Sequence, residues 1–111
     1  MLVHVVMFRF KTEVDQETRA TVIAAAKEMK HLDSVMGHKL LVGSPSVTNP
    51  LTMSQGYDFA LVSYHNDLEA LTAYQKSPRH QHLVSSYLKP NLDDLVRFDF
   101  EVDKEDEHMI V

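Results

Sequence analysis

The stretch that decides the fold is Leu2-Val3-His4-Val5-Val6-Met7-Phe8-Arg9-Phe10. In a strand, successive side chains point to opposite faces, so His4 shares one face with Val6 and Phe8, while Met7 lies on the other. Both faces are largely apolar. Because such a strand is covered on both sides, we expect helices on one face of its sheet and a second cover on the other.

The helices are predicted from their caps and from apolar residues at helical spacing. Asp15 is an N-cap candidate for a helix over residues 16–32. Asp67 begins a second helical segment in the same way. The helix restarts at Ser77-Pro78, because serine is a favoured N-cap and proline is favoured in the first helical position.

Three further strands complete the sheet, and they are predicted over residues 38–43, 57–64 and 95–102. The order is therefore β-α-β-β-α-β. This is the order of a ferredoxin-like sandwich, an α+β fold in which one antiparallel sheet carries helices on a single face. Residues 44–55 form a loop that is dense in turn residues and unusually long, which indicates a lid or a dimer contact.

One face of such a sheet stays bare. Because the strands over residues 2–10 and 57–64 are apolar on both sides, an isolated subunit would expose a large hydrophobic surface. Exposed apolar surfaces of that size mark an interface. The residues therefore predict that something covers the second face.

Composition excludes several kinds of site. The chain has 111 residues, which predicts one domain, over residues 1–102. It contains no cysteine, so disulfides, cysteine-ligated metal sites and a thiol nucleophile are excluded. The sequence has neither a glycine-rich phosphate loop nor Gly-x-Ser-x-Gly, so we expect no nucleotide cofactor and no serine-hydrolase chemistry.

Acidic charge is concentrated at the C-terminal end. Of the net charge of −5, residues 101–107 contribute −4, because five acidic residues oppose one lysine there. We expect residues 103–111 to be a flexible acidic tail. The rest of the chain is nearly neutral and has no basic stripe, so we expect no nucleic-acid binding.

The N-terminal apolar run is interrupted by His4 and followed by charged residues, so we expect no signal peptide and no membrane span, and a cytoplasmic protein.

His4, Tyr74 and His80 are the candidate site residues. His4 lies on an apolar strand face, where a buried imidazole requires a partner. Tyr74 and His80 flank the helix break at Pro78, which can direct both side chains into one pocket. The structural alternatives are a core histidine, a tyrosine packed beside Leu71 and a surface histidine.

Metal binding is not predicted from local spacing. His80 and His82 are two residues apart on a predicted helix, so they point about 200° apart around it. The other five histidines have no ligand partner at suitable spacing, which leaves open only a site assembled from distant residues. Asp58 and Asp99 are strand acids that can pair with Arg97 or Lys39, and we expect for them either a solvated-face role or an ion-pair role.

Four segments resemble the stress-responsive A/B barrel (Dabb) family. They are His4, Gly56-Tyr57-Asp58, Tyr74-Gln75-Lys76-Ser77-Pro78-Arg79-His80 and Val96-Arg97-Phe98-Asp99-Phe100. The resemblance covers roughly residues 2–102. It implies a homodimer in which two sheets face one another to form an α/β barrel.

The resemblance also implies a function. In a plant polyketide cyclase of this family, a strand histidine, a helix tyrosine and a second histidine stand at the positions of His4, Tyr74 and His80. By that likeness, His80 is the general base for an aldol closure, while Tyr74 and His4 hold a small carbonyl or phenolic ligand. No cofactor is implied. The alternative is a non-enzymatic dimer with a stress-related or ligand-binding role.

Overall fold

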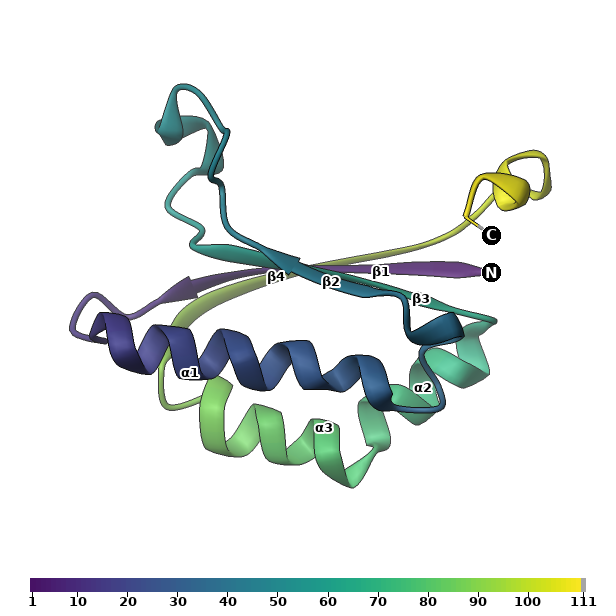
Figure 1. Cartoon of the computed structure of the whole chain (residues 1–111), viewed down its shortest axis with the longest axis horizontal. Coiled ribbons are helices and arrows are strands. Elements are labelled where there is room, and N and C mark those ends of the chain that lie inside the picture. The colour runs from purple at the N-terminus through teal and green to yellow at the C-terminus, as the bar shows by residue number, and fades with distance from the viewer. Residues whose placement is uncertain (111) are drawn as a thin grey trace.

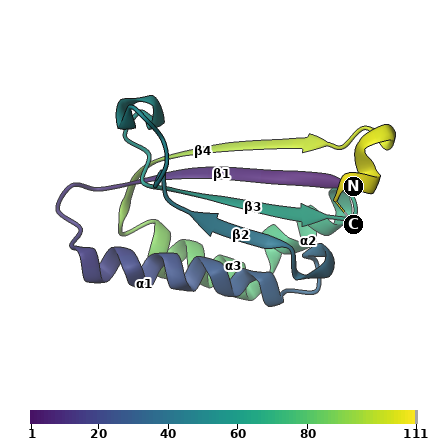
Figure 2. The same cartoon turned by 45° about the horizontal axis from the view of Figure 1, so that its top comes forward.

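The computed structural model describes residues 1–110 and contains a four-stranded antiparallel sheet. Its strands lie in the order β2-β3-β1-β4, and they are β1 (Leu2–Phe10), β2 (Leu40–Gly43), β3 (Phe59–His65) and β4 (Leu92–Glu101). The helices on one face of the sheet are α1 (Gln16–Lys27), α2 (Leu68–Lys76) and α3 (Pro78–Leu83), while the opposite face is open (Figure 1; Figure 2). The predicted α+β ferredoxin-like fold is therefore confirmed.

Side-chain caps fix where the helices begin. The Asp15 carboxylate accepts a hydrogen bond from the Thr18 N–H at 2.8 Å, and Asp67 does the same for Ala70 at 2.8 Å. These bonds satisfy N–H groups that have no partner within the helix. Pro78 occupies the first turn of α3, as predicted, and the helix continues as a π-helical turn over Val84–Leu88.

Several boundaries differ from the prediction. The first helix stops at Lys27 and continues as a 3-10 turn over Glu28–His31. Strand β2 begins two residues later than predicted, because Gly37 and His38 have positive φ angles of 57° and 56°, which are incompatible with extended backbone. The loop over residues 44–55 contains a 3-10 turn, Leu51–Ser54.

The other two strands also shift. Strand β3 covers Phe59–His65 rather than residues 57–64, and β4 covers Leu92–Glu101 rather than residues 95–102. The long pairing of β4 with β1 explains its early start, because Phe10 pairs with Leu92 after a register shift.

The core lies between the sheet and the helices. Phe8 on β1 stacks on Phe59 of β3 with ring centroids 4.3 Å apart, and Phe10 lies 5.3 Å from the same ring. Val22 and Leu71 bring α1 and α2 onto this layer. Each large buried side chain contributes roughly 1.5–3 kcal/mol relative to exposure, so this face holds the sheet and helices together.

The open face of the sheet is apolar as well. Here the exposed large side chains come from three strands, and they are Met7, Leu41, Val96, Phe98 and Phe100. Phe98 keeps 65% of its surface exposed and Leu41 keeps 69%. We call these five residues the open-face patch.

The segment after Val102, predicted to be a flexible tail, contains a 3-10 helix over Lys104–Met109. Its Glu107 carboxylate lies 3.9 Å from the N-terminal amino group, and Lys39 Nζ donates a hydrogen bond to the Ile110 carbonyl. The flexibility expected of residues 103–111 stays a prediction, while the 3-10 helix and these contacts are features that it did not include. Composition alone misses this arrangement, because the antiparallel pairing of β1 and β4 brings the two ends of the chain together.

Candidate functional site

A cavity of about 260 Å³ lies between the sheet and the helices, and His4, Tyr74 and His80 all line it. His4 comes from β1, Tyr74 from the last turns of α2, and His80 from the first turn of α3. The remaining wall is mostly apolar, and its residues include Val6, Phe8, Leu61, Leu83, Val84 and Leu88. The structure thus brings the three predicted site residues to one mostly apolar pocket, although their chemical roles stay predictions.

Tyr74 is the centre of a group of four rings. Its ring centroid lies 4.7 Å from that of His80, 5.7 Å from His4 and 4.9 Å from His65. Tyr74 is buried, with 1% of its surface exposed. The break at Pro78 produces this arrangement, because it lets residues from two consecutive helices approach the same point.

His4 is held by an acid on the neighbouring strand. Asp99 is its partner in the β1–β4 ladder, and the two side chains form a hydrogen bond of 2.5 Å between Nδ1 and Oδ1. Because a carboxylate accepts, Nδ1 donates. The second oxygen of Asp99 lies 3.2 Å from Arg97 Nε, so the interpretation of Asp99 and Arg97 as an ion pair is correct.

Asp58 has different partners. Its carboxylate accepts a hydrogen bond from the Phe10 N–H at 2.8 Å and lies 3.4 Å from Arg19. It therefore anchors the end of β1 and does not belong to the cavity.

His65 is a buried polar residue of this cluster that sequence reasoning missed. Its Nδ1 is 2.7 Å from the Ser34 carbonyl, and its Nε2 is 2.8 Å from the Ser63 hydroxyl. Since a carbonyl can only accept, Nδ1 carries the proton and Nε2 accepts from Ser63. The signal was present, because the period of two places Ser63 and His65 on the same strand face as Phe59 and Leu61.

Burial sets the protonation of the cavity groups. It raises the pKa of Tyr74, so the phenol keeps its proton and is a hydrogen-bond donor. Burial also lowers the pKa of His80, and the nearby His4 lowers it further, against an opposing effect of the Gln75 carbonyl. The ring centroids of Tyr74 and His80 lie 4.7 Å apart, so a phenol that keeps its proton and an imidazole with a lowered pKa share this end of the cavity.

The sequence model of the family described as Stress responsive A/B Barrel Domain (Dabb) matches residues 2–102. The chain belongs to the Dabb family. A comparison with curated proteins finds no match.

Solved structures share the Dabb fold of this chain. A "dimeric ferredoxin-like protein of unknown function" from Thermobifida fusca is 22% identical, with 91% of this chain and 90% of that chain covered and a TM-score of 0.74. A Dabb family protein from Mesorhizobium loti is 17% identical, with 92% and 96% covered and a TM-score of 0.75. A hydroxynitrile lyase from Passiflora edulis is 15% identical, with 93% and 94% covered and a TM-score of 0.78.

A larger cavity of the Dabb chain, of about 500 Å³, lies between the loop over residues 44–55 and the open face of the sheet. Met7 and Ala60 form its floor, and Met53 contributes from the loop. None of its lining side chains is charged, and Tyr57, which lines it, donates its hydroxyl hydrogen bond to Asp94 at 2.7 Å. The smaller cavity therefore has the groups that can move protons.

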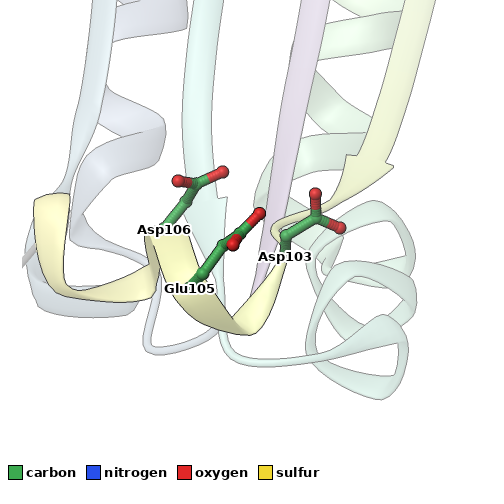
Figure 3. Close-up of side chains that lie close together, drawn as sticks. All are labelled: Asp103, Glu105 and Asp106. Carbon is green, nitrogen blue, oxygen red and sulfur yellow. The ribbon is translucent and has the colours of Figure 1, made fainter.

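Three exposed carboxylates gather in the C-terminal segment of the Dabb chain. Asp103, Glu105 and Asp106 bring oxygens within 4.8 Å of one another (Figure 3). Exposed acidic groups of this kind are common without a bound ion. We therefore assign no metal site to them.

Among residues 1–110, no helix has the length and apolar character needed to cross a membrane.

Proposed function

We propose that this Dabb chain forms a homodimer through the open-face patch, and that each subunit binds a small carbonyl or phenolic ligand in the cavity beside Tyr74. We further propose that His80, Tyr74 and His4 carry out acid–base chemistry on that ligand. The observation that supports this best is the approach of three titratable rings, from three separate elements, in one mostly apolar cavity.

The proposed reaction begins with loss of a proton from a carbon next to a carbonyl. Neutral His80 takes that proton, and the electron pair moves onto the carbonyl oxygen to form an enolate. The Tyr74 hydroxyl donates a hydrogen bond to that oxygen as its negative charge develops. His80 then returns the proton to the ligand, so the chain ends the cycle unchanged and needs no cofactor.

His4 has a supporting part in this proposal. Its Nδ1 is committed to Asp99, which leaves Nε2 as the only ring nitrogen free to act on a ligand. Because Nε2 of this tautomer accepts, we assign to His4 a hydrogen bond from a hydroxyl group of the ligand.

Two observations support the dimer and the chemistry. The open-face patch presents five large apolar side chains on one sheet face, which is more than isolated surface residues explain. The fold of this chain is also that of dimeric proteins and of a protein named a hydroxynitrile lyase, so the fold accommodates both assembly and catalysis.

We also propose a cytoplasmic location, which the cysteine-free composition supports, and no nucleic-acid partner.

Exchange of the methyl protons of acetophenone for deuterium tests this function. We expect the protein to bind this small aromatic ketone and to accelerate the exchange, followed by proton NMR in D2O. His80→Ala should reduce the acceleration by about 10²–10⁴. Because the half-buried His80 ring packs against Tyr74, the free energy of unfolding of this variant is measured as well, and exchange is compared under conditions in which both proteins are folded. His82→Ala is the matched control, since His82 is exposed two residues away.

The outcomes separate the candidate functions. Binding of acetophenone without accelerated exchange would contradict catalysis and favour the ligand-binding dimer. An equal loss in the His80→Ala and His82→Ala variants would show that His80 is not the base. Failure of acetophenone to shift the NMR signals of His4 and His80 would remove the cavity as its binding site.

A further inference from the structure

We infer that the ligand of this cavity carries a carboxylate in addition to its carbonyl or phenol, and that the Arg97 guanidinium binds that carboxylate. The inference rests on the proposed function, because it concerns the same cavity. It names the chemical class of the ligand and a residue that selects it.

Arg97 lies at the wall of the cavity on the edge strand of the sheet. It is opposite Val6 in the β1–β4 ladder, and both residues line the cavity together with His4. The Arg97 side chain is 56% exposed, so it stands where the cavity meets solvent. A charged group at such an entrance can contact one end of a ligand while the rings around Tyr74 contact the other.

The guanidinium has donors to spare. Among residues 1–110, its one charged partner is Asp99, which lies 3.2 Å from Nε. Asp99 is already bonded to His4 at 2.5 Å, so its single negative charge serves two partners. A guanidinium presents five N–H donors in a planar fork that matches a carboxylate.

The cavity as a whole favours an anion. Its ionisable lining groups are His4, Tyr74, His80 and Arg97, and no carboxylate side chain lines it. Tyr74 keeps its proton, so it too presents a donor. Asp99 offsets the Arg97 charge from outside the lining, so inside the cavity the donors of Arg97 and Tyr74 face no carboxylate and suit one carried by a compact, flat ligand.

A structural alternative is that Arg97 serves only to pair with Asp99. In that case the guanidinium would be saturated by its own chain and water, and it would not distinguish ligands by charge. The two possibilities differ in one measurable quantity, which is the preference of the cavity for a carboxylate on an otherwise identical ligand.

The test compares acetophenone with 3- and 4-acetylbenzoate, which add a carboxylate at two positions of the same ring. Binding is measured by NMR titration of the His4 and His80 signals. We expect the better acetylbenzoate to bind the wild-type protein about tenfold more tightly than acetophenone, as one charge-assisted contact allows. In Arg97→Gln this preference, taken as the ratio of the two dissociation constants measured on the same variant, should fall to about one. Arg97→Lys should keep part of the preference for the acetylbenzoate.

Arg79→Gln is the control for net charge, because Arg79 is exposed on α3 and lines a different groove. It should retain the full preference. Equal binding of acetophenone and both acetylbenzoates to the wild-type protein would overturn the inference and leave the proposed function standing. A preference that persists in Arg97→Gln would overturn the assignment to Arg97. If none of the three probes shifts the His4 and His80 signals, both the inference and the proposed cavity fail.

Discussion

His4 on β1 and Asp99 on β4 are paired across the antiparallel ladder, and Nδ1 of His4 donates to Oδ1 of Asp99 over 2.5 Å. The two residues are 95 positions apart in the chain. The His4 side chain is buried and Asp99 is about three-quarters buried, with 24% of its side chain exposed. Water therefore replaces this bond poorly, and the carboxylate fixes both the tautomer and the orientation of the ring.

Replacing Asp99 by asparagine should destabilise the protein. The amide keeps an acceptor oxygen but removes the charge, so we expect the free energy of unfolding to fall by about 1–2 kcal/mol in urea denaturation. Asp93→Asn is the control, because Asp93 pairs with the half-exposed Arg9 at the surface and should cost less than about 0.5 kcal/mol. Equal costs for the two variants would contradict a special role for the His4–Asp99 pair.

Stability should decrease as the pH drops below about 6.5, the ordinary histidine pKa. Burial lowers the pKa of His65 in the folded state, with a smaller contribution from the nearby His4, and the pKa of His80 is lowered in the same way. Between the folded and unfolded pKa values the unfolded chain binds more protons. The stability that these two histidines contribute is therefore fully present above their pKa in the unfolded chain. It is lost as the pH falls toward their lower pKa in the folded state.

Melting temperatures measured between pH 7.5 and about pH 5 would check this dependence. His65→Gln should flatten it, although the variant loses hydrogen bonds to Ser34 and Ser63 and starts from a lower melting temperature. His82→Gln should leave the dependence unchanged, since His82 is exposed. A slope that does not differ between the wild type and His65→Gln would show that His65 does not titrate as described.

Light scattering should give twice the chain mass of 12.7 kDa at micromolar concentration. Phe98→Lys places a charge in the middle of the open-face patch and should shift the mass toward a monomer, because a buried unpaired charge is costly. Leu68→Lys changes an equally exposed side chain, 68% against 65%, on α2 and should remain dimeric. A wild-type mass near that of one chain would exclude the dimer.

Deleting the residues after Val102 should have a small effect. Their contacts are a 3.9 Å ion pair between Glu107 and the N-terminal amino group and one hydrogen bond from Lys39, and partly exposed polar contacts of this kind contribute about 0–1 kcal/mol. The dimer should persist, and the melting temperature should fall by no more than a few degrees. Loss of the dimer on truncation would show that this segment contacts the partner subunit.

Local sequence signals predicted most of the elements, because they depend on neighbours along the chain. Asp15 and Asp67 begin their helices as predicted, and Ser77-Pro78 restarts the helix. The boundary of β2 was wrong because the left-handed backbone at His38 has no strong local signal in a non-glycine residue. The C-terminal 3-10 helix was missed because its contacts come from the other end of the chain.

Alternation in the first strand was enough to predict that His4 faces the core and that the sheet has two apolar faces, since side-chain direction in a strand has a fixed period of two. The same period of two, applied to the third strand, would have placed Ser63 and His65 on the buried face beside His4. The sequence by itself could not identify Asp99 as the partner of His4, or Ser34 as that of His65. Those pairings depend on strand order, register and the path of a loop, and these are decided by packing between segments that are distant in the chain. The sequence therefore determined which faces are apolar, and only the tertiary structure decided which polar groups meet in the core.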